Sequence, residues 1–476
     1  MSDPFSSRYD AIPYRHGAVP HSHPARIGAI ARLFGMRVAS PDRCRVLELG
    51  CAEGMNLLPL AERLPQSQFT GVDFSSAQIA VADEARRLVG IANANFVCAD
   101  LRQFEAEPEA FDYIIAHGVY SWVPDDVKER VLAICAKSLA PGGVAYVSYN
   151  TLPGWGLLGG LRKFMLAETA SANDPASQLD RSRRVLDVLA QCLSAQPGGY
   201  AEMMREAVAD MLAKSPALLF HDELGAVNDP STFLDFTAHA ARHGLHFLAE
   251  AHYASMPFEH VPAPMRSALA ALGPDFLREQ QFMDVLFQRW LRSSLLCRAE
   301  PTRTADASAI CECALGLRLR PASASANLQP GVPMRFTGAN GLALDFDGAF
   351  EKAFLSALAE AASARVPFAD ACERALGFLD RVGLPQPADT AEICAKLLHL
   401  FSIDALDLVL TGGGEWLRER TPAGPSALML HQARGEFSVT NRWHELVALT
   451  SEGRGAIVGE IHPANVTALR RTGLLV

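Results

Sequence analysis

The sequence predicts an α/β fold built on a parallel sheet, and three observations predict it. First, the apolar run 45–49 ends in closely spaced small residues before a helical pattern, as a buried parallel strand does when it turns into a helix. Second, similar strand-like runs follow at 68–73, 94–100 and 111–118, with helical patterns at about 54–64, 75–90 and 125–139. Third, a Pro-Gly-Gly turn precedes a fifth apolar run at 144–150. Strands that alternate with helices in this way form one parallel sheet.

The turn after the first strand has the pattern Glu-x-Gly-x-Ala-x-Gly, from Glu48 to Gly54. Its small residues remove side chains where a ligand approaches the backbone, and the helix that follows offers unpaired N–H groups. A dinucleotide-binding turn has the spacing G-x-G-x-x-G instead. We interpret this turn as the cradle of a small molecule.

Carboxylates stand at the ends of the next two strands. Asp73 follows the first glycine by about twenty residues, where a carboxylate accepts hydrogen bonds from ribose hydroxyls in nucleotide-binding sheets. Asp100 ends the third strand. Ser75 and Ser76, and likewise Asp125 and Asp126 after Pro124, are predicted to cap the helices that follow them.

With these landmarks in order, the chain resembles the class I S-adenosylmethionine (SAM) methyltransferases. The resemblance implies a Rossmann-like seven-stranded sheet, SAM as cofactor, S-adenosylhomocysteine as product, and contact of Asp100 with the adenine amino group. The predicted cofactor-binding residues are Glu48, Gly50, Cys51, Ala52, Gly54, Asn56, Asp73, Phe74, Gln78, Asp100, Leu101 and His117.

Composition limits the classes of function. The 476 residues suffice for two or three domains, and the net charge of −10 disfavours nucleic acid and anionic membrane as partners. No apolar run is long enough to span a bilayer, and residues 1–8 do not resemble a signal peptide. Ten scattered cysteines suit reduced thiols, so we predict a cytoplasmic protein. No metal site is predicted, since Cys311-x-Cys313 and the pair His21 and His23 lack further ligands.

Residues 1–40 are predicted to form an N-terminal cap. Aromatic, proline and histidine residues cluster at 9–14 and 20–24, and a helix is expected from about 25 to 35. We expect this leader to fold over the cofactor and exclude water. The alternative is that it only packs against the edge of the sheet.

The predicted methyltransferase domain spans 41–300. Amphipathic helices at about 157–225 form an insertion between the fifth strand and the helix 230–243, which precedes a sixth strand at 244–250. A seventh strand is expected at 292–298. Such an insertion lies over the carboxyl ends of the strands, where it serves as a lid, a substrate wall or a homodimer surface.

Residues 301–476 are predicted to form a smaller α+β, winged-helix-like accessory domain. A hairpin at 334–345 is followed by helices near 348–363, 367–379 and 388–398. This region has 16 Lys and Arg against 19 Asp and Glu. A DNA-reading wing is basic, so we favour contact with protein.

Several segments resemble a bacterial family that carries a methyltransferase regulatory domain. They are 9–14, 48–54, 117–124, 149–155, 220–224 and 240–245. Characterised members of that family include protein-lysine methyltransferases that act on outer-membrane proteins. The resemblance therefore implies a protein substrate with a lysine acceptor.

A lysine acceptor must lose its proton before it attacks. Its ordinary pKa of ~10.4 places the neutral amine ~4 kcal/mol uphill at pH 7. An apolar, aromatic pocket lowers this cost by disfavouring the ammonium.

Aromatic and polar residues near the ends of the fourth and fifth strands are the candidates for the acceptor side. The predicted catalytic residues are Tyr120, His117, Trp122, Tyr149, Asn150 and Tyr14. Trp122 alternatively packs on the following helix, and His117 is either a proton acceptor or a satisfied loop histidine. The leading hypothesis is a SAM-dependent methyltransferase acting on protein lysine. The alternatives are a small-molecule methyltransferase and a non-catalytic SAM-binding regulatory protein.

Overall fold

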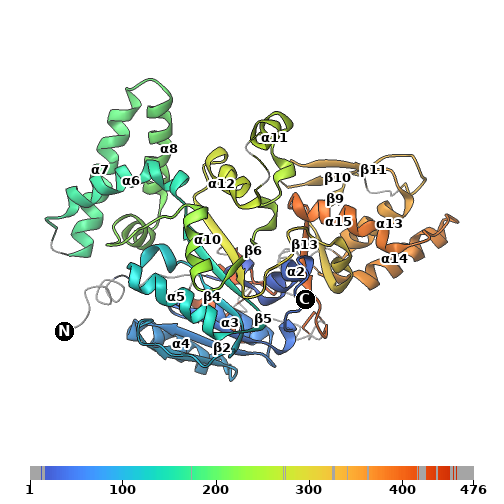
Figure 1. Cartoon of the computed structure of the whole chain (residues 1–476), viewed down its shortest axis with the longest axis horizontal. Helices are drawn as coiled ribbons and strands as arrows, with labels where there is room; N and C mark the ends of the chain where they lie inside the picture. Colours follow the sequence, from blue (N-terminus) through green and yellow to red (C-terminus); the bar gives the residue numbers. More distant parts are fainter. Residues whose placement is uncertain are drawn as a thin grey trace.

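A seven-stranded sheet forms the centre of the larger domain (Figure 1), with the strand order β3-β2-β1-β4-β5-β7-β6. Neighbouring strands are parallel except where β7 pairs with β5 and β6. The strands are β1 (Arg45–Leu49), β2 (Gln68–Asp73), β3 (Ala94–Cys98), β4 (Phe111–Ala116), β5 (Leu139–Asn150), β6 (His246–Glu250) and β7 (Leu291–Cys297). The predicted seven-stranded sheet is confirmed.

The computed structural model describes most of the 476-residue chain. The described residues are 12, 17–172, 174–271, 273, 275–323, 327–339, 341–361, 364–414, 416–417, 425–435, 438–450, 454 and 457.

The three predicted helices between the strands are present, although the first begins at Leu57 rather than at about residue 54 and one predicted cap is wrong. They are α3 (Leu57–Arg63), α4 (Ser76–Val89) and α5 (Asp125–Ser138). Ser75 caps α4, because its side chain accepts a hydrogen bond from the Gln78 N–H. The expected cap by Asp125 and Asp126 is wrong: Pro124 is the N-cap, and the two carboxylates in the first turn pair with Lys128 and Arg102 instead.

The Pro-Gly-Gly segment lies within β5 and is a bulge rather than a turn before the strand. Phe111 pairs with Leu139, but Tyr113 pairs with Val144, so the register shifts between them. Gly142 has φ +115° here, and a Cβ at this position would lie 2.2 Å from the carbonyl oxygen of Arg37. Only glycine fits this close backbone approach.

The insertion follows β5 and has a core of its own. Its helices are α6 (Leu152–Thr169), α7 (Pro175–Ser194), α8 (Gly199–Ala213), α9 (Pro216–Leu218) and η4 (Leu219–Glu223). Trp155, Met165, Leu186 and Phe220 are among the buried side chains that hold it together. The chain then enters α10 (Phe233–Arg242) and β6, in the predicted order. In Figure 1, α7 and α8 project away from the sheet.

The connection from β6 to β7 adds α11 (Ala263–Ala270) and α12 (Phe276–Leu286), which the sequence analysis did not assign. It also supplies Asp284 to a buried ion-pair group. The Arg292 guanidinium on β7 lies 2.6 Å from Glu250 and 2.8 Å from Asp284, and over the ring of Phe233. These contacts join β6, β7, α10 and α12.

The smaller C-terminal α+β domain is also confirmed. Its described sheets have the orders β12-β8-β13, β11-β10-β9 and β14-β15, and the hairpin β10–β11 occupies its predicted place. The elements are β8 (Cys313–Leu317), β9 (Leu319–Pro321), β10 (Met334–Gly338), β11 (Ala343–Phe346), α13 (Ala349–Glu360), β12 (Val366–Pro367), α14 (Phe368–Arg381), α15 (Ile393–Ser402), β13 (Leu406–Leu410), α16 (Ala427–Gly435), β14 (Ser438–Thr440) and β15 (Leu446–Ala448).

The helix predicted in the N-terminal leader is α2 (Pro24–Leu33), and it packs against β13. Arg26 on α2 pairs with Asp407 on β13 at 2.6 Å, and both side chains are buried. Arg365 also pairs with Asp407. Buried charge pairs therefore hold the leader helix to the C-terminal domain.

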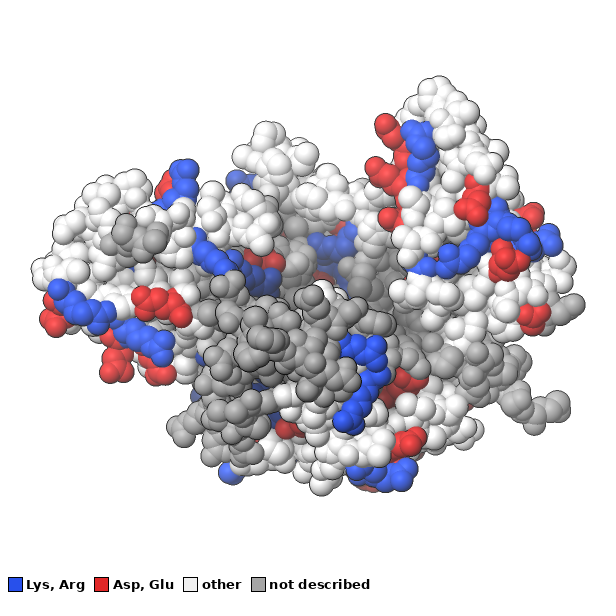
Figure 2. All heavy atoms as spheres, turned by 180° about the vertical axis from the view of Figure 1, so that it is seen from behind, with Lys and Arg blue, Asp and Glu red and all other residues white. Residues whose placement is uncertain are grey.

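The surface carries mixed charge. On the face drawn in Figure 2, Lys and Arg side chains lie beside Asp and Glu side chains. Within the described residues, no helix has both the length and the apolar character required to cross a bilayer.

Candidate active site

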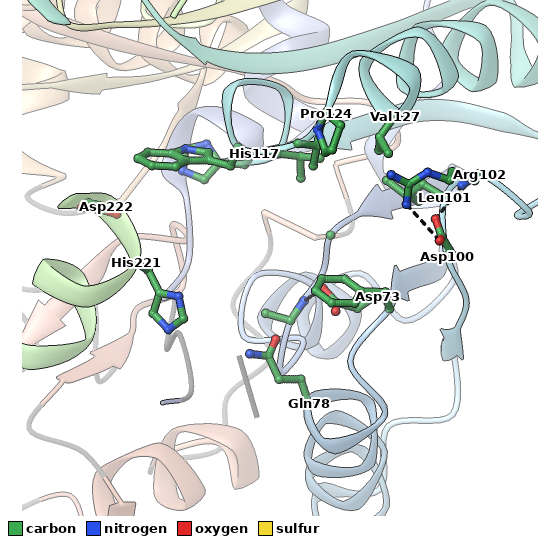
Figure 3. A pocket seen from close by; sticks show the side chains of 17 residues that line it. Asp73, Gln78, Asp100, Leu101, Arg102, His117, Pro124, Val127, His221 and Asp222 are labelled. Carbon is green, nitrogen blue, oxygen red and sulfur yellow. Dashed lines mark hydrogen bonds and ion pairs between the residues drawn. The ribbon is translucent and has the colours of Figure 1, made fainter. Parts of the chain in front are cut away.

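A cavity of about 150 Å³ lies at the carboxyl ends of β1, β2 and β4 (Figure 3). Residues that follow β1, β2 and β3 line the side where the cofactor is predicted to bind. The segment after β4 and η4 line the opposite side, which we call the acceptor side. It is lined by Gly50, Ala52, Asp73, Phe74, Gln78, Asp100, Leu101, Arg102, His117, Gly118, Val119, Trp122, Val123, Pro124, Val127, His221 and Asp222. Eight of these were predicted to bind the cofactor.

The turn after β1 requires glycine at its first position. Gly50 has φ +73°, and a Cβ there would lie 2.5 Å from Cγ2 of Val119. The N–H groups of Gly50 and Cys51 both donate to the Val72 carbonyl, which pins the turn to β2. Ala52 follows with φ +48°. A bare backbone therefore faces the cavity.

Asp73 is held rigidly at the end of β2. One carboxylate oxygen accepts a hydrogen bond from the Ala52 N–H at 3.0 Å, and the other accepts one from the Ser75 N–H at 2.9 Å. The side chain is buried yet lines the cavity. This geometry joins the turn to β2 and presents carboxylate oxygens to a ligand.

Asp100 is more open than Asp73. Its carboxylate accepts from the Arg102 N–H at 2.9 Å and pairs with the Arg102 guanidinium at 3.2 Å, as Figure 3 shows. Arg102 itself lines the cavity and also pairs with Asp126. The sequence analysis missed Arg102.

Four predicted cofactor-binding residues do not line this cavity. A Cβ on Gly54 would lie 2.6 Å from the ring of Phe96, so Gly54 permits close packing of the turn. The side chain of Cys51 is buried, and burial raises the pKa of its thiol. Glu48 and Asn56 lie behind the turn. These four residues of the Glu-x-Gly-x-Ala-x-Gly segment and the helix after it therefore pack around the turn and support it.

Glu48 is fully buried behind the turn. Its Oε1 accepts from Asn56 Nδ2 at 2.8 Å, while its Oε2 has no hydrogen-bond partner among the described residues. Burial raises the pKa of Glu48 to about 8, although the bond from Asn56 opposes the rise.

The acceptor side of the cavity combines aromatic and polar groups. Trp122 lines it and packs edge-to-face on Trp155 of the insertion. His117 also lines it, with Nδ1 3.0 Å from the Tyr146 hydroxyl. His221 and Asp222 come from η4 and face Asp73 and Gln78 across the cavity in Figure 3. No role for these two residues was predicted, although they belong to one of the family-like segments.

The N-terminal leader reaches this side of the site. The carbonyl oxygen of Ile12 lies 2.5 Å from Nε2 of His221, and the Ile12 side chain packs with Trp122 against the insertion core. The contact places Ile12 beside the cavity, and the N-terminal cap stays a prediction. Tyr14, which we predicted to contact the acceptor, lies outside the described residues.

Tyr120, Tyr149 and Asn150 do not line this cavity, contrary to expectation. The buried Tyr120 ring packs edge-to-face on Phe236, and Tyr149 stacks on the same ring. Asn150 Nδ2 donates to Asn228. The short helix η3 (Tyr120–Trp122) turns Trp122 toward the cavity and Tyr120 toward α10, because neighbouring residues on a helical turn point in different directions.

Comparison with known proteins agrees with this site. Residues 46–143 match a methyltransferase domain, and residues 215–298 match a predicted methyltransferase regulatory domain. The structure of PKMT2 from Rickettsia typhi in complex with AdoHcy superimposes with a TM-score of 0.82 at 25% identity, covering 97% of this chain and 91% of that one.

Two relatives come from Rickettsia prowazekii (strain Madrid E). The chain is 32% identical to the uncharacterized protein RP028 over 234 residues, which cover 49% of this chain and 94% of RP028. It is 33% identical to the uncharacterized protein RP789 over 289 residues, covering 61% of this chain and 52% of RP789, so it spans about half the length of that relative.

The fold, the cradle and these matches together define the class: the chain belongs to the class I SAM-dependent methyltransferases that carry the methyltransferase regulatory domain. Its cofactor is SAM. The residues present fit this group, since a buried carboxylate and an open backbone turn face one cavity.

Proposed function

We propose that this protein transfers methyl groups from SAM to the side-chain amine of lysine in a protein substrate. One observation carries the proposal: an indole, an imidazole and a carboxylate, from Trp122, His221 and Asp222, line one cavity, and His221 and Asp222 lie across it from Asp73 and Gln78 (Figure 3). An indole face and a carboxylate attract an alkylammonium, and the Asp222 carboxylate already pairs with one in the structure, the Lys214 ammonium at 3.2 Å. The name PKMT2 of the matching R. typhi protein is consistent with the same acceptor.

We infer a division of labour within the cavity. Asp73 and the backbone of Gly50 and Ala52 would hold the cofactor, which supplies an activated methyl group when bound. Trp122 and Val123 would wall the acceptor stem and exclude water, so that the neutral amine is less costly there than in solution. Methyl transfer requires no covalent enzyme intermediate, so holding the two reactants in line is the main task of these residues.

His117 and His221 are the groups available to receive the amine proton. Both line the cavity, and the ordinary histidine pKa lies near neutrality. Nδ1 of His117 is engaged by Tyr146, whereas Nε2 of His221 is engaged by Ile12.

The test is transfer of labelled methyl groups from SAM to proteins of a lysate from cells that lack this gene. We expect label on lysine residues, identified by mass spectrometry after digestion. Asp222→Asn should lower transfer by about tenfold, since one ion-binding contact contributes about 1–2 kcal/mol. Asp210→Asn, at an exposed position on α8, is the matched control and should leave transfer unchanged.

Two other outcomes would contradict the proposal. Label on small metabolites alone would make this a small-molecule methyltransferase, with the insertion as its lid. No transfer, despite calorimetric binding of S-adenosylhomocysteine, would make it a non-catalytic SAM-binding protein. A homodimer through the insertion stays a separate prediction, which light scattering tests.

A further inference from the structure

Glu129, His239 and His243 form a cluster outside the cavity. Glu129 lies on α5, while His239 and His243 lie four residues apart on α10 and so share one face of that helix. His239 Nε2 is 3.0 Å from Glu129 Oε1, and His243 Nε2 is 2.9 Å from Oε2. Their ligand-type atoms all lie within 4.8 Å of one another.

His239 is oriented in the way metal-binding histidines are. Its Nδ1 lies 2.6 Å from the hydroxyl of Tyr120, so that contact holds the ring and directs Nε2 at Glu129. A ligating histidine usually uses its second nitrogen in such a bond. Nε2 is buried and makes no hydrogen bond of good geometry with a described residue, despite its approach to Glu129.

The simpler explanation is a cluster of charged side chains that holds α5 against α10. Arg242 supports it, since its guanidinium lies 3.5 Å from Glu129 Oε1. This arginine is mostly exposed, however, and its long side chain is free to turn toward water. Nε2 of His239 points at Glu129 but makes no good hydrogen bond with it, and an ion bound between the two groups explains this better.

We propose that Glu129, His239 and His243 bind a divalent transition-metal ion, with zinc preferred. Two imidazole nitrogens and one carboxylate oxygen are a common zinc donor set, and water completes a tetrahedral site. The exposed Glu129 leaves this fourth position open to solvent. In this arrangement Nδ1–H of His239 donates to the Tyr120 oxygen, which leaves Nε2 free to bind the metal.

The ion would brace the wall of the active-site cavity. It would join α5 to α10 and, through His239, fix Tyr120 in η3. Val119 and Trp122, on either side, both line the cavity. The site is thus a structural support for the acceptor side and takes no part in methyl transfer.

The test measures metal content directly. Zinc also binds exposed thiols, so the background protein carries Cys98→Ser, Cys192→Ser and Cys311→Ser, which replace the three exposed cysteines. After zinc loading and gel filtration, elemental analysis should give one zinc per chain. Glu129→Gln and His243→Gln should each reduce this at least tenfold, and zinc should raise the melting temperature of the background protein but of neither variant.

Glu84→Gln, at an exposed position on α4, is the matched control and should retain one zinc. Circular dichroism confirms that each variant is folded. Cobalt in place of zinc should give visible bands of a tetrahedral nitrogen- and oxygen-bound ion. Zinc content below one per chain in the background protein, or equal content in Glu129→Gln and Glu84→Gln, would overturn the proposal and leave only an ion-pair cluster.

Discussion

Asn56 and His444 contact each other across 388 residues of sequence: Nε2 of His444 lies 2.7 Å from Oδ1 of Asn56. Asn56 also donates through Nδ2 to Glu48 at 2.8 Å and accepts from the Val19 N–H at 2.9 Å. Burial lowers the pKa of His444, so its ring is neutral and Nε2–H donates. One amide thus connects the C-terminal segment, the leader and the strand that leads into the cofactor cradle.

Removing this amide should destabilise the protein and weaken cofactor binding. Asn56→Ala leaves buried groups on Glu48 and His444 without their partner, at a cost of about 1–3 kcal/mol. Urea denaturation measures the loss, and calorimetry with S-adenosylhomocysteine should show weaker binding. Asn95→Ala, on the exposed side of β3, should change stability by less than about 0.5 kcal/mol. Equal effects of the two substitutions would contradict the role assigned to Asn56.

Glu48 should make stability fall as pH rises. Its pKa is raised from 4.5 to about 8 by burial, so the folded state holds a proton that the unfolded state has released between these values. The stability that this proton contributes is therefore fully present below about pH 4.5, and that contribution is lost as pH rises toward 8. Glu48→Gln should flatten the decline of the melting temperature over this range. A variant with the same pH profile as the wild type would show that Glu48 is ionised in the fold.

Gly50→Ala should abolish cofactor binding. The new Cβ would meet Val119 at 2.5 Å and would also have to adopt φ +73°. Gly90→Ala is the matched control, since Gly90 has φ +75° and no atom within 4 Å of the added Cβ. The control should cost about 1–2 kcal/mol from backbone strain and keep normal binding. Titration with S-adenosylhomocysteine distinguishes the two; normal binding by Gly50→Ala would mean that the cradle tolerates a side chain.

Asp73→Ala should weaken cofactor binding by at least tenfold. The substitution removes the carboxylate from the cavity and frees the N–H groups of Ala52 and Ser75. Asp83→Ala serves as the comparison, because that carboxylate pairs with Arg86 and Arg87 on the surface of α4, away from the cavity lining. It should bind the cofactor as the wild type does. Competition with labelled SAM gives both affinities, and unchanged affinity of Asp73→Ala would remove Asp73 from the cofactor site.

The sequence by itself determined the sheet and the donor half of the site. Apolar runs that alternate with helical patterns specify strands and helices locally, and the residues at strand ends must meet at one edge of a parallel sheet. Gly50, Ala52, Asp73 and Asp100 could therefore be placed together without coordinates. The places of β6, β7, the insertion and the C-terminal hairpin along the chain were predictable from local patterns as well.

Only the tertiary structure decided which side chains face the cavity from the acceptor side. Tyr120 and Trp122 are two residues apart, but η3 directs Tyr120 toward α10 and Trp122 toward the cavity. A helix of three residues is too short to be predicted from the periodicity of apolar residues. His221, near the C-terminal end of the insertion, lines the same cavity as Trp122. Contacts such as Asn56 with His444, or Glu129 with His243, depend on how distant elements pack, since residues so far apart in the chain are brought together only by the fold.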